Sequence, residues 1–262
     1  MKTVLDFQKA KKAAQKISML TCYDYTMATL VAESTIDVIL VGDSLAMTMH
    51  GHSDTLPATP ELMALHVAAV RRGAPSKFIV GDMPFLAHRG SLDSTLSAVA
   101  QIMRAGAQAV KIEGIQGSAQ TIAHIVESGV PVMGHLGLTP QSVHQFGGFK
   151  VQATGNEAGE WLLGQARMLQ DAGAFALVLE CVPALVAKYV TENLDIPTIG
   201  IGAGPDCSGQ VLVLQDMLGL NPKFKPKFVR TFLDGHALLK TAFDDYDRLV
   251  KMREFPTEKE SY

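Results

Sequence analysis

Short apolar runs recur along the whole chain, and each of them ends in glycine or polar residues. A continuous apolar run of this length is typical of a strand that is buried on both faces, as in a parallel sheet. The runs span residues 17–24, 37–44, 77–85, 109–114, 130–137, 175–181, 197–204 and 210–216. The pattern therefore predicts about eight parallel strands.

Helical patterns separate most of these runs. The segment 59–74 begins with a Thr-Pro pair that suits a helix N-terminus, and segments 91–107 and 156–174 have the same apolar spacing. All three end in a glycine shortly before the next strand, as a left-handed helix C-cap favours. About eight alternations of strand and helix predict a (β/α)8 TIM barrel, with a doubly wound sheet as the alternative.

The two ends of the chain lie outside this alternation. Residues 1–20 carry lysines without a long apolar stretch, which indicates an amphipathic helix and argues against a secretory signal. Residues 224–255 have helical periodicity and mixed charge, so a C-terminal helical extension is expected, either capping the barrel or packing a subunit interface. We expect residues 1–262 to form a single barrel domain.

Composition narrows the class of protein. Of the 262 residues, 47% are hydrophobic and 19% charged, which allows a large buried core. The net charge of -3 and the absence of a basic stripe argue against a nucleic-acid partner. No apolar run reaches the roughly 18 residues of a membrane helix, so no membrane partner is expected. Three widely spaced cysteines fit a reducing compartment, and the predicted location is the cytoplasm.

Polar side chains gather at the predicted carboxyl ends of the strands, the face where barrels of this kind place their active sites. These residues are Asp43, Ser44, Asp82, Lys111, Glu113, His135 and Glu180. Lys111 and Glu113 are two positions apart, so both side chains point to the same face of their strand. Inside a barrel that face is the lumen, where an unpaired charge is costly.

Carboxylates that face one another repel, and a hard divalent cation relieves that repulsion. Aspartate and glutamate oxygens, with one histidine and no cysteine, suit Mg²⁺ better than Zn²⁺. Asp43 and Asp82 are candidate ligands, with Glu113 beside them or acting through water, and Glu180 is a candidate general base. The alternative is a purely structural set of salt bridges centred on Lys111.

Several longer motifs resemble one known enzyme family. They include "VILVGDSLAM" (38–47), "GDMPF" (81–85), "GHLGLTPQSV" (134–143) followed by "FGG", and "LVLECVP" (177–183). In this order they resemble the ketopantoate hydroxymethyltransferase family, and the resemblance covers roughly residues 4 to 235. It implies a barrel of the phosphoenolpyruvate/pyruvate type and a Mg²⁺ cofactor. The implied reaction transfers a hydroxymethyl group from 5,10-methylenetetrahydrofolate to 3-methyl-2-oxobutanoate, giving 2-dehydropantoate on the way to pantothenate.

The resemblance also implies roles for individual residues. The implied metal site consists of Asp43, Asp82 and Glu113. The implied oxo-acid contacts are Asp43, Ser44, Asp82 and Lys111. Glu180 is the implied proton acceptor, and family members form large rings, so a homodecamer is expected. His135 is our own candidate for proton transfer at the new hydroxymethyl group, with a backbone-bonded loop histidine as the alternative.

Two other classes fit part of this pattern. Relatives of isocitrate lyase and phosphoenolpyruvate mutase also bind Mg²⁺ and an oxo acid in a barrel, but they typically carry a "KKCGH"-like loop that this chain lacks. Use of a folate would separate the transferase from these lyases. A non-catalytic scaffold is the third reading, and the cost of keeping so many buried charges argues against it.

Overall fold

Eight strands form one closed, all-parallel barrel in sequence order, in which β1 pairs with β8. The computed structural model describes residues 2–148, 150–223 and 225–262. Met1 and Phe224, which belong to the predicted terminal segments, and Phe149 lie outside the described residues. The predicted (β/α)8 barrel is confirmed, and the doubly wound alternative is wrong. The chain divides into two compact units, Met1–Leu212 and Val213–Tyr262.

Each strand lies within its predicted apolar run or starts one residue before it. The strands are β1 (Ile17–Thr21), β2 (Val38–Val41), β3 (Phe78–Asp82), β4 (Ala109–Glu113), β5 (Val132–Gly137), β6 (Ala176–Glu180), β7 (Thr198–Ile201) and β8 (Gly209–Leu212). They are shorter than the runs because most of the terminal glycine and polar residues belong to the loops at the carboxyl ends.

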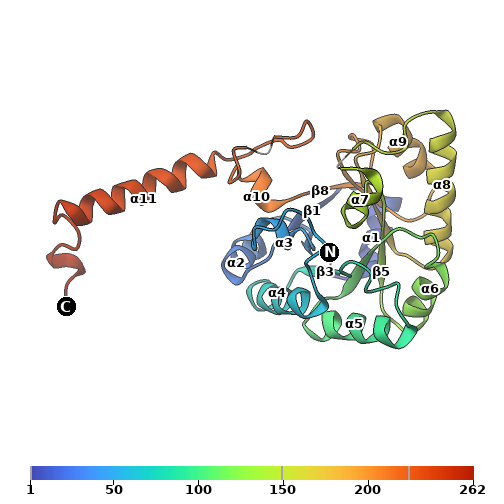
Figure 1. The fold of residues 1–262 in the computed structure, drawn as a ribbon, viewed down its shortest axis with the longest axis horizontal. Helices are drawn as coiled ribbons and strands as arrows, with labels where there is room; N and C mark the ends of the chain where they lie inside the picture. Colours follow the sequence, from blue (N-terminus) through green and yellow to red (C-terminus); the bar gives the residue numbers. More distant parts are fainter. Residues whose placement is uncertain (1, 149, 224) are drawn as a thin grey trace. The chain divides into compact units, whose positions relative to one another are not determined.

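Helices surround the barrel (Figure 1). They are α2 (Tyr25–Glu33), α4 (Pro60–Gly73), α5 (Leu92–Arg104), α6 (Ala119–Glu127), α8 (Asn156–Asp171) and α9 (Ala184–Glu192). Shorter helical turns follow β2 and β5, namely α3 (Leu45–Thr48), η1 (Pro140–Ser142) and α7 (Val143–Phe146). The expected strand–helix alternation fails once, because residues 202–208 connect β7 to β8 without a helix.

The helix starts and stops follow the local sequence signals. The Thr59 side chain accepts a hydrogen bond from the backbone N–H of Leu62 at 3.2 Å, which caps the start of α4. Just after the C-terminal ends of α5 and α8, Gly106 and Gly173 have φ angles of 118° and 90°. A glycine reaches this region at low cost, so α5 and α8 end where the sequence predicts. For Gly73 the prediction is wrong, because this glycine is the last residue of α4 and has no positive φ, and Ala74 with a φ of -129° forms the C-cap.

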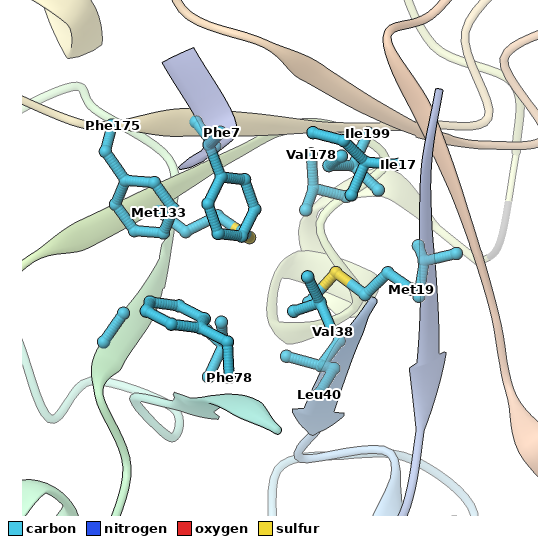
Figure 2. Close-up of a cluster of buried hydrophobic side chains, with 14 of the residues drawn as sticks. Phe7, Ile17, Met19, Val38, Leu40, Phe78, Met133, Phe175, Val178 and Ile199 are labelled. Atoms are coloured by element: carbon cyan, nitrogen blue, oxygen red, sulfur yellow. The ribbon is translucent and has the colours of Figure 1, made fainter. Parts of the chain in front are cut away.

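The N-terminal helix closes the amino end of the barrel. This helix, α1 (Val4–Lys12), is shorter than the predicted segment 1–20, because β1 takes up residues 17–21. Its Phe7 is fully buried against Phe78 at the start of β3 and Phe175 just before β6 (Figure 2). The ring centroids lie 5.3 and 5.0 Å from that of Phe7 in edge-to-face arrangements. The three phenylalanine rings therefore form an apolar floor at the amino end of the barrel lumen.

The lumen changes from apolar to polar along each strand. In β3, Phe78 and Val80 belong to the apolar cluster, and Asp82 is the next residue on the same face. The same alternation runs along β6 and ends in Glu180. Chemistry-bearing side chains therefore lie at the carboxyl end of the barrel, on top of a packed apolar layer.

The second unit is helical, as predicted for the tail, and contains α10 (Leu214–Met217), α11 (Gly235–Lys251) and η2 (Glu258–Glu260). One side of α11 leaves large apolar residues exposed, namely Leu239, Phe243, Tyr246 and Val250. Across the described part of the chain, no helix combines the length and apolar character needed to cross a membrane. That residues 1–262 form a single domain stays a prediction.

Candidate active site

The seven predicted site residues come together at the carboxyl end of the barrel. Neighbouring strands set their spacing, because Asp82 of β3 is in register with Lys111 of β4, and Glu113 of β4 is in register with His135 of β5. These four side chains are almost completely buried. The strand order thus turns residues that are far apart in the sequence into one cluster.

Lys111 lies at the centre of the cluster. Its Nζ is 3.1 Å from Oδ2 of Asp82, 3.8 Å from Oε1 of Glu113 and 3.2 Å from Nδ1 of His135. Burial lowers the pKa of Lys111, but the carboxylates of Asp82, Glu113 and Asp43 outweigh it and hold the pKa above its usual value. The side chain is therefore a buried ammonium ion, held by carboxylates from β3, from its own strand β4 and from the segment directly after β2.

His135 bridges two carboxylates. Its Nδ1 lies 3.3 Å from Oε1 of Glu113, and its Nε2 lies 3.1 Å from Oε2 of Glu180. Burial and the ammonium of Lys111 both oppose protonation, but the two carboxylates outweigh them and raise the pKa of His135 to about 9. His135 is therefore a strand residue between charged partners, and the alternative of a backbone-bonded loop histidine is wrong.

Asp43 follows β2 and lies beside Asp82. Its backbone N–H donates to Oδ2 of Asp82 at 3.0 Å. Burial, followed by repulsion from Asp82 and Glu113, raises the pKa of Asp43 well above its usual value. Burial also raises the pKa of Asp82, whereas His135 and Lys111 outweigh burial and lower the pKa of Glu113. Two of the three predicted metal ligands are thus carboxyl groups whose ionisation a nearby cation would favour.

Gln141 is a site residue that the sequence analysis missed. Its Nε2 donates to Oδ2 of Asp43 at 2.7 Å and to the carbonyl of Met83 at 2.9 Å, and its backbone N–H donates to Oε2 of Glu113 at 3.0 Å. It lies in η1, in the loop after β5. Its position in the long motif 134–143, after a strand end, was the only signal in the sequence. A position of this kind does not indicate which side chains Gln141 contacts.

The donor set fits a magnesium ion in part. Oδ1 of Asp82 is buried and has no hydrogen-bond partner among the residues that the structure describes. Over the same residues, no group of three or more His, Cys, Asp or Glu side chains is arranged as a complete ligand set. Mg²⁺ usually needs only one or two carboxylates, since waters and substrate oxygens complete its shell. The acidic oxygen ligands available here are the type that this ion prefers.

Ser44 and Tyr23 form the wall of the site next to β1 and β2. The hydroxyl oxygens of Tyr23 and Ser44 are 2.7 Å apart, and Tyr23 is fully buried. A Cβ at Gly42 would lie 2.9 Å from the Ser44 hydroxyl and 3.5 Å from Oδ2 of Asp82. The missing side chain at Gly42 therefore lets the hydroxyl and the carboxylate face the same space.

Glu180 ends β6, and its side chain is 17% exposed, so a molecule entering from outside can reach it. Two backbone features fix its position. Gly137 has a φ of 91°, and a Cβ there would lie 2.2 Å from the carbonyl oxygen of Glu180. Cys181 has a φ of 48°, unusual for a residue with a side chain, so the chain turns sharply directly after Glu180.

A closed parallel barrel with a buried cluster of mixed charge at the carboxyl ends is typical of a (β/α)8-barrel enzyme. The family model "Ketopantoate hydroxymethyltransferase" matches residues 1–258. A 3-methyl-2-oxobutanoate hydroxymethyltransferase of Bdellovibrio bacteriovorus is 59% identical over the full length of both chains. An enzyme of the same name from Coxiella burnetii is 56% identical, with 96% of this chain and 95% of that one covered. The chain therefore belongs to the ketopantoate hydroxymethyltransferase family.

Solved structures agree with this fold at much lower identity. A phosphonopyruvate hydrolase has a TM-score of 0.66 at 12% identity, covering 99% of this chain and 93% of that one. A 2,3-dimethylmalate lyase of the PEP mutase/isocitrate lyase superfamily has a TM-score of 0.60 at 16% identity, covering 100% and 92%. These likenesses agree with the (β/α)8 barrel fold. The family match confirms the predicted resemblance and the hydroxymethyltransferase class.

Proposed function

We propose that the chain transfers a hydroxymethyl group from 5,10-methylenetetrahydrofolate to 3-methyl-2-oxobutanoate, giving 2-dehydropantoate in pantothenate biosynthesis. Family membership supports the transferase class and the oxo acid, which is the substrate named for the relatives. The observation that carries the chemistry is the buried cluster, in which Lys111 provides a fixed positive charge and Glu180 a reachable carboxylate. These are the groups needed to bind a carboxylate and to remove a neighbouring proton.

The first step is removal of the proton from C3 of the oxo acid. Lys111 and Ser44 bind the substrate carboxylate and orient C3 toward Glu180, whose carboxylate accepts the proton. Asp43 and Asp82, with Glu113 beside them, would hold a Mg²⁺ ion. When bound, this ion supplies Lewis acidity to the oxo acid. A positive charge next to a forming enolate is a large contribution to catalysis in a buried site.

The second step forms the new carbon–carbon bond. Water adds to the one-carbon unit of the folate and releases it as formaldehyde, while its two protons pass to the two nitrogens of the tetrahydrofolate that leaves. The C3 carbanion then attacks the formaldehyde carbon, and the electron pair of the C=O bond moves to the oxygen as an alkoxide. His135 lies between Glu113 and Glu180 and passes a proton to or from that oxygen. Its contact with Glu180 provides a path by which the proton removed from C3 returns to the product.

The test is proton NMR of 3-methyl-2-oxobutanoate in D₂O with enzyme and Mg²⁺. We expect loss of the C3 proton signal, dependent on Mg²⁺ and slowed at least about a hundredfold in Glu180→Gln. Glu192→Gln is the matched control, because this carboxylate is exposed at the end of α9. Absence of exchange in the folded wild-type protein would refute the proposal and favour a lyase-like enzyme or a scaffold.

We also propose that the chain forms a cytoplasmic homodecamer. The apolar side of α11, formed by Leu239, Phe243, Tyr246 and Val250, supports association, because a stripe of this size is costly in water. The free cysteines fit a reducing compartment. Light scattering should give ten times the mass of one chain, and Phe243→Asp should lower it. A monomeric wild-type protein would contradict this proposal.

A further inference from the structure

We propose that the folate donor binds in the cavity between the loops that follow β3, β4 and β5, with His88 as its buried hydrogen-bond donor. This inference rests on the proposed function. The cavity has a volume of about 460 Å³, and its walls include Phe85, Leu86, His88 and Gln116. That volume lies within the range of about 300–1,000 Å³ that is usual for small-molecule sites.

The position of the cavity fits a donor of one-carbon units. Glu113 and Gln141 line it, and both belong to the buried cluster as well. Gln141 lies between the cavity and the buried cluster, because its side chain donates to Asp43 and its backbone N–H donates to Glu113. Transfer requires the donor carbon to reach C3 of the oxo acid. A ligand in this cavity lies directly against two side chains of the cluster.

The walls of the cavity suit a flat, amphipathic ring. Phe85 and Leu86 are 40% and 55% exposed in the loop after β3, although both are large apolar residues. Leu86 has a φ of 59°, a conformation that residues with side chains rarely adopt. A pteridine or aminobenzoyl ring that stacks on these residues would remove their apolar surface from water.

His88 provides the polar recognition element. Its side chain is 3% exposed, and its Nε2 accepts a hydrogen bond from Nε of Arg89 at 3.1 Å. Burial and the charge of Arg89 lower the pKa of His88 to about 4, so the ring is neutral and carries its proton on Nδ1. Nδ1 is buried and has no hydrogen-bond partner within the described part of the chain. Neighbouring atoms cover Nδ1, so a ring nitrogen or carbonyl oxygen of a pterin would satisfy it once the His88 side chain turns toward the cavity.

The rim of the cavity suits the acidic end of a folate. Arg89 is exposed there, and its Nη1 donates to the backbone carbonyl of Gln116, which holds the guanidinium in place. A folate ends in a glutamate with two carboxylates. A fixed guanidinium at the mouth therefore complements that end of the ligand, while the apolar wall and His88 complement the rings.

The experiment uses two cavity variants and one matched control. His88→Phe keeps a ring at this position and removes the N–H donor. Gln116→Trp fills the mouth from an exposed turn and leaves the backbone carbonyl in place. Gln120→Trp is the control, because Gln120 is exposed in α6 and does not line the cavity. Each protein is tested for tetrahydrofolate binding by calorimetry, for the methylene-donor concentration that half-saturates turnover, and for C3 exchange of the oxo acid without folate.

We expect the Kd of tetrahydrofolate to rise about tenfold in His88→Phe, as loss of one buried hydrogen bond predicts. The half-saturating donor concentration should rise in parallel. Gln116→Trp should raise both at least as much, and Gln120→Trp should leave them unchanged. The rate of C3 exchange should stay within about twofold in all three proteins, because the exchange step needs no folate. Gln116→Trp keeps the test decisive if His88→Phe does not fold.

Two failures are distinguishable. If both variants bind tetrahydrofolate as tightly as the wild type while C3 exchange persists, the cavity is not the folate site, and the proposed function stands. If the wild type shows neither exchange nor tetrahydrofolate binding, the proposed function itself fails, and this inference falls with it.

Discussion

The apolar floor beneath the active site can be tested with Phe7→Ala. Phe7 is fully buried, and its ring meets Phe78 and Phe175 at centroid distances of 5.3 and 5.0 Å. Truncation of a buried phenylalanine to alanine typically costs about 3–5 kcal/mol, because a cavity remains. Edge-to-face contacts of this kind contribute about 1 kcal/mol of that loss. For a chain of this size the midpoint of thermal unfolding should fall by roughly 6–10 °C.

The matched control is Leu5→Ala, in the same helix. Leu5 is 58% exposed, so its loss should lower the midpoint by less than about 2 °C. Activity of folded Phe7→Ala at low temperature should be unchanged, because Phe78 and Asp82 are four residues apart on one strand, which is about 13 Å. Differential scanning calorimetry and an activity assay below the unfolding transition measure both effects. Equal decreases in the unfolding midpoint for the two variants would refute the conclusion that packing of Phe7 stabilises the barrel.

Three further predictions concern the site. Tyr23→Phe removes the hydrogen bond between the Tyr23 and Ser44 hydroxyls, so kcat/KM for the oxo acid should fall roughly five- to tenfold in steady-state kinetics. Burial lowers the pKa of His88 from 6.5 to about 4, so the unfolded chain binds the extra proton between these values. Because this proton favours the unfolded chain, the free energy of unfolding is highest above pH 6.5 and decreases as the pH falls toward 4. Between about pH 7 and 5, the wild type should therefore lose about 2 kcal/mol more unfolding free energy than His88→Phe in urea titrations. Chelation of divalent cations should abolish C3 exchange, and added Mg²⁺ should restore it, whereas exchange that persists after chelation would contradict a metal site.

Local sequence patterns were sufficient for the barrel and for the clustering of the candidate residues at its carboxyl end, whereas the roles of these residues stay predictions. The spacing of Lys111 and Glu113 placed both on one face of β4, and the structure shows them in one buried cluster. This worked because strand alternation is a local rule and because parallel strands bring their carboxyl ends together. The same rule placed Asp82 and Glu180 at the carboxyl ends of their strands.

Features that depend on contacts between distant segments could not be predicted from the sequence. Gln141 lies in a loop, and its partners Asp43 and Glu113 come from two other strand ends, so no local pattern marks it. His88 is hidden for the same reason, since its burial depends on how the loop after β3 folds. Counting strand–helix units also failed between β7 and β8, where a short loop connects the two strands without a helix.

The burial of α1 has a consequence for how the chain is made. Residues 4–12 are synthesised long before the segments they need, because Phe7 packs against Phe175, and β1 finds its last partner in β8 at residues 209–212. At about 5–20 residues per second, roughly 10–40 seconds of synthesis separate these segments. During that interval the apolar side of α1 and one edge of β1 have no native partner. A ribosome-bound chain that ends before residue 212 should therefore depend on chaperones more than the completed barrel does.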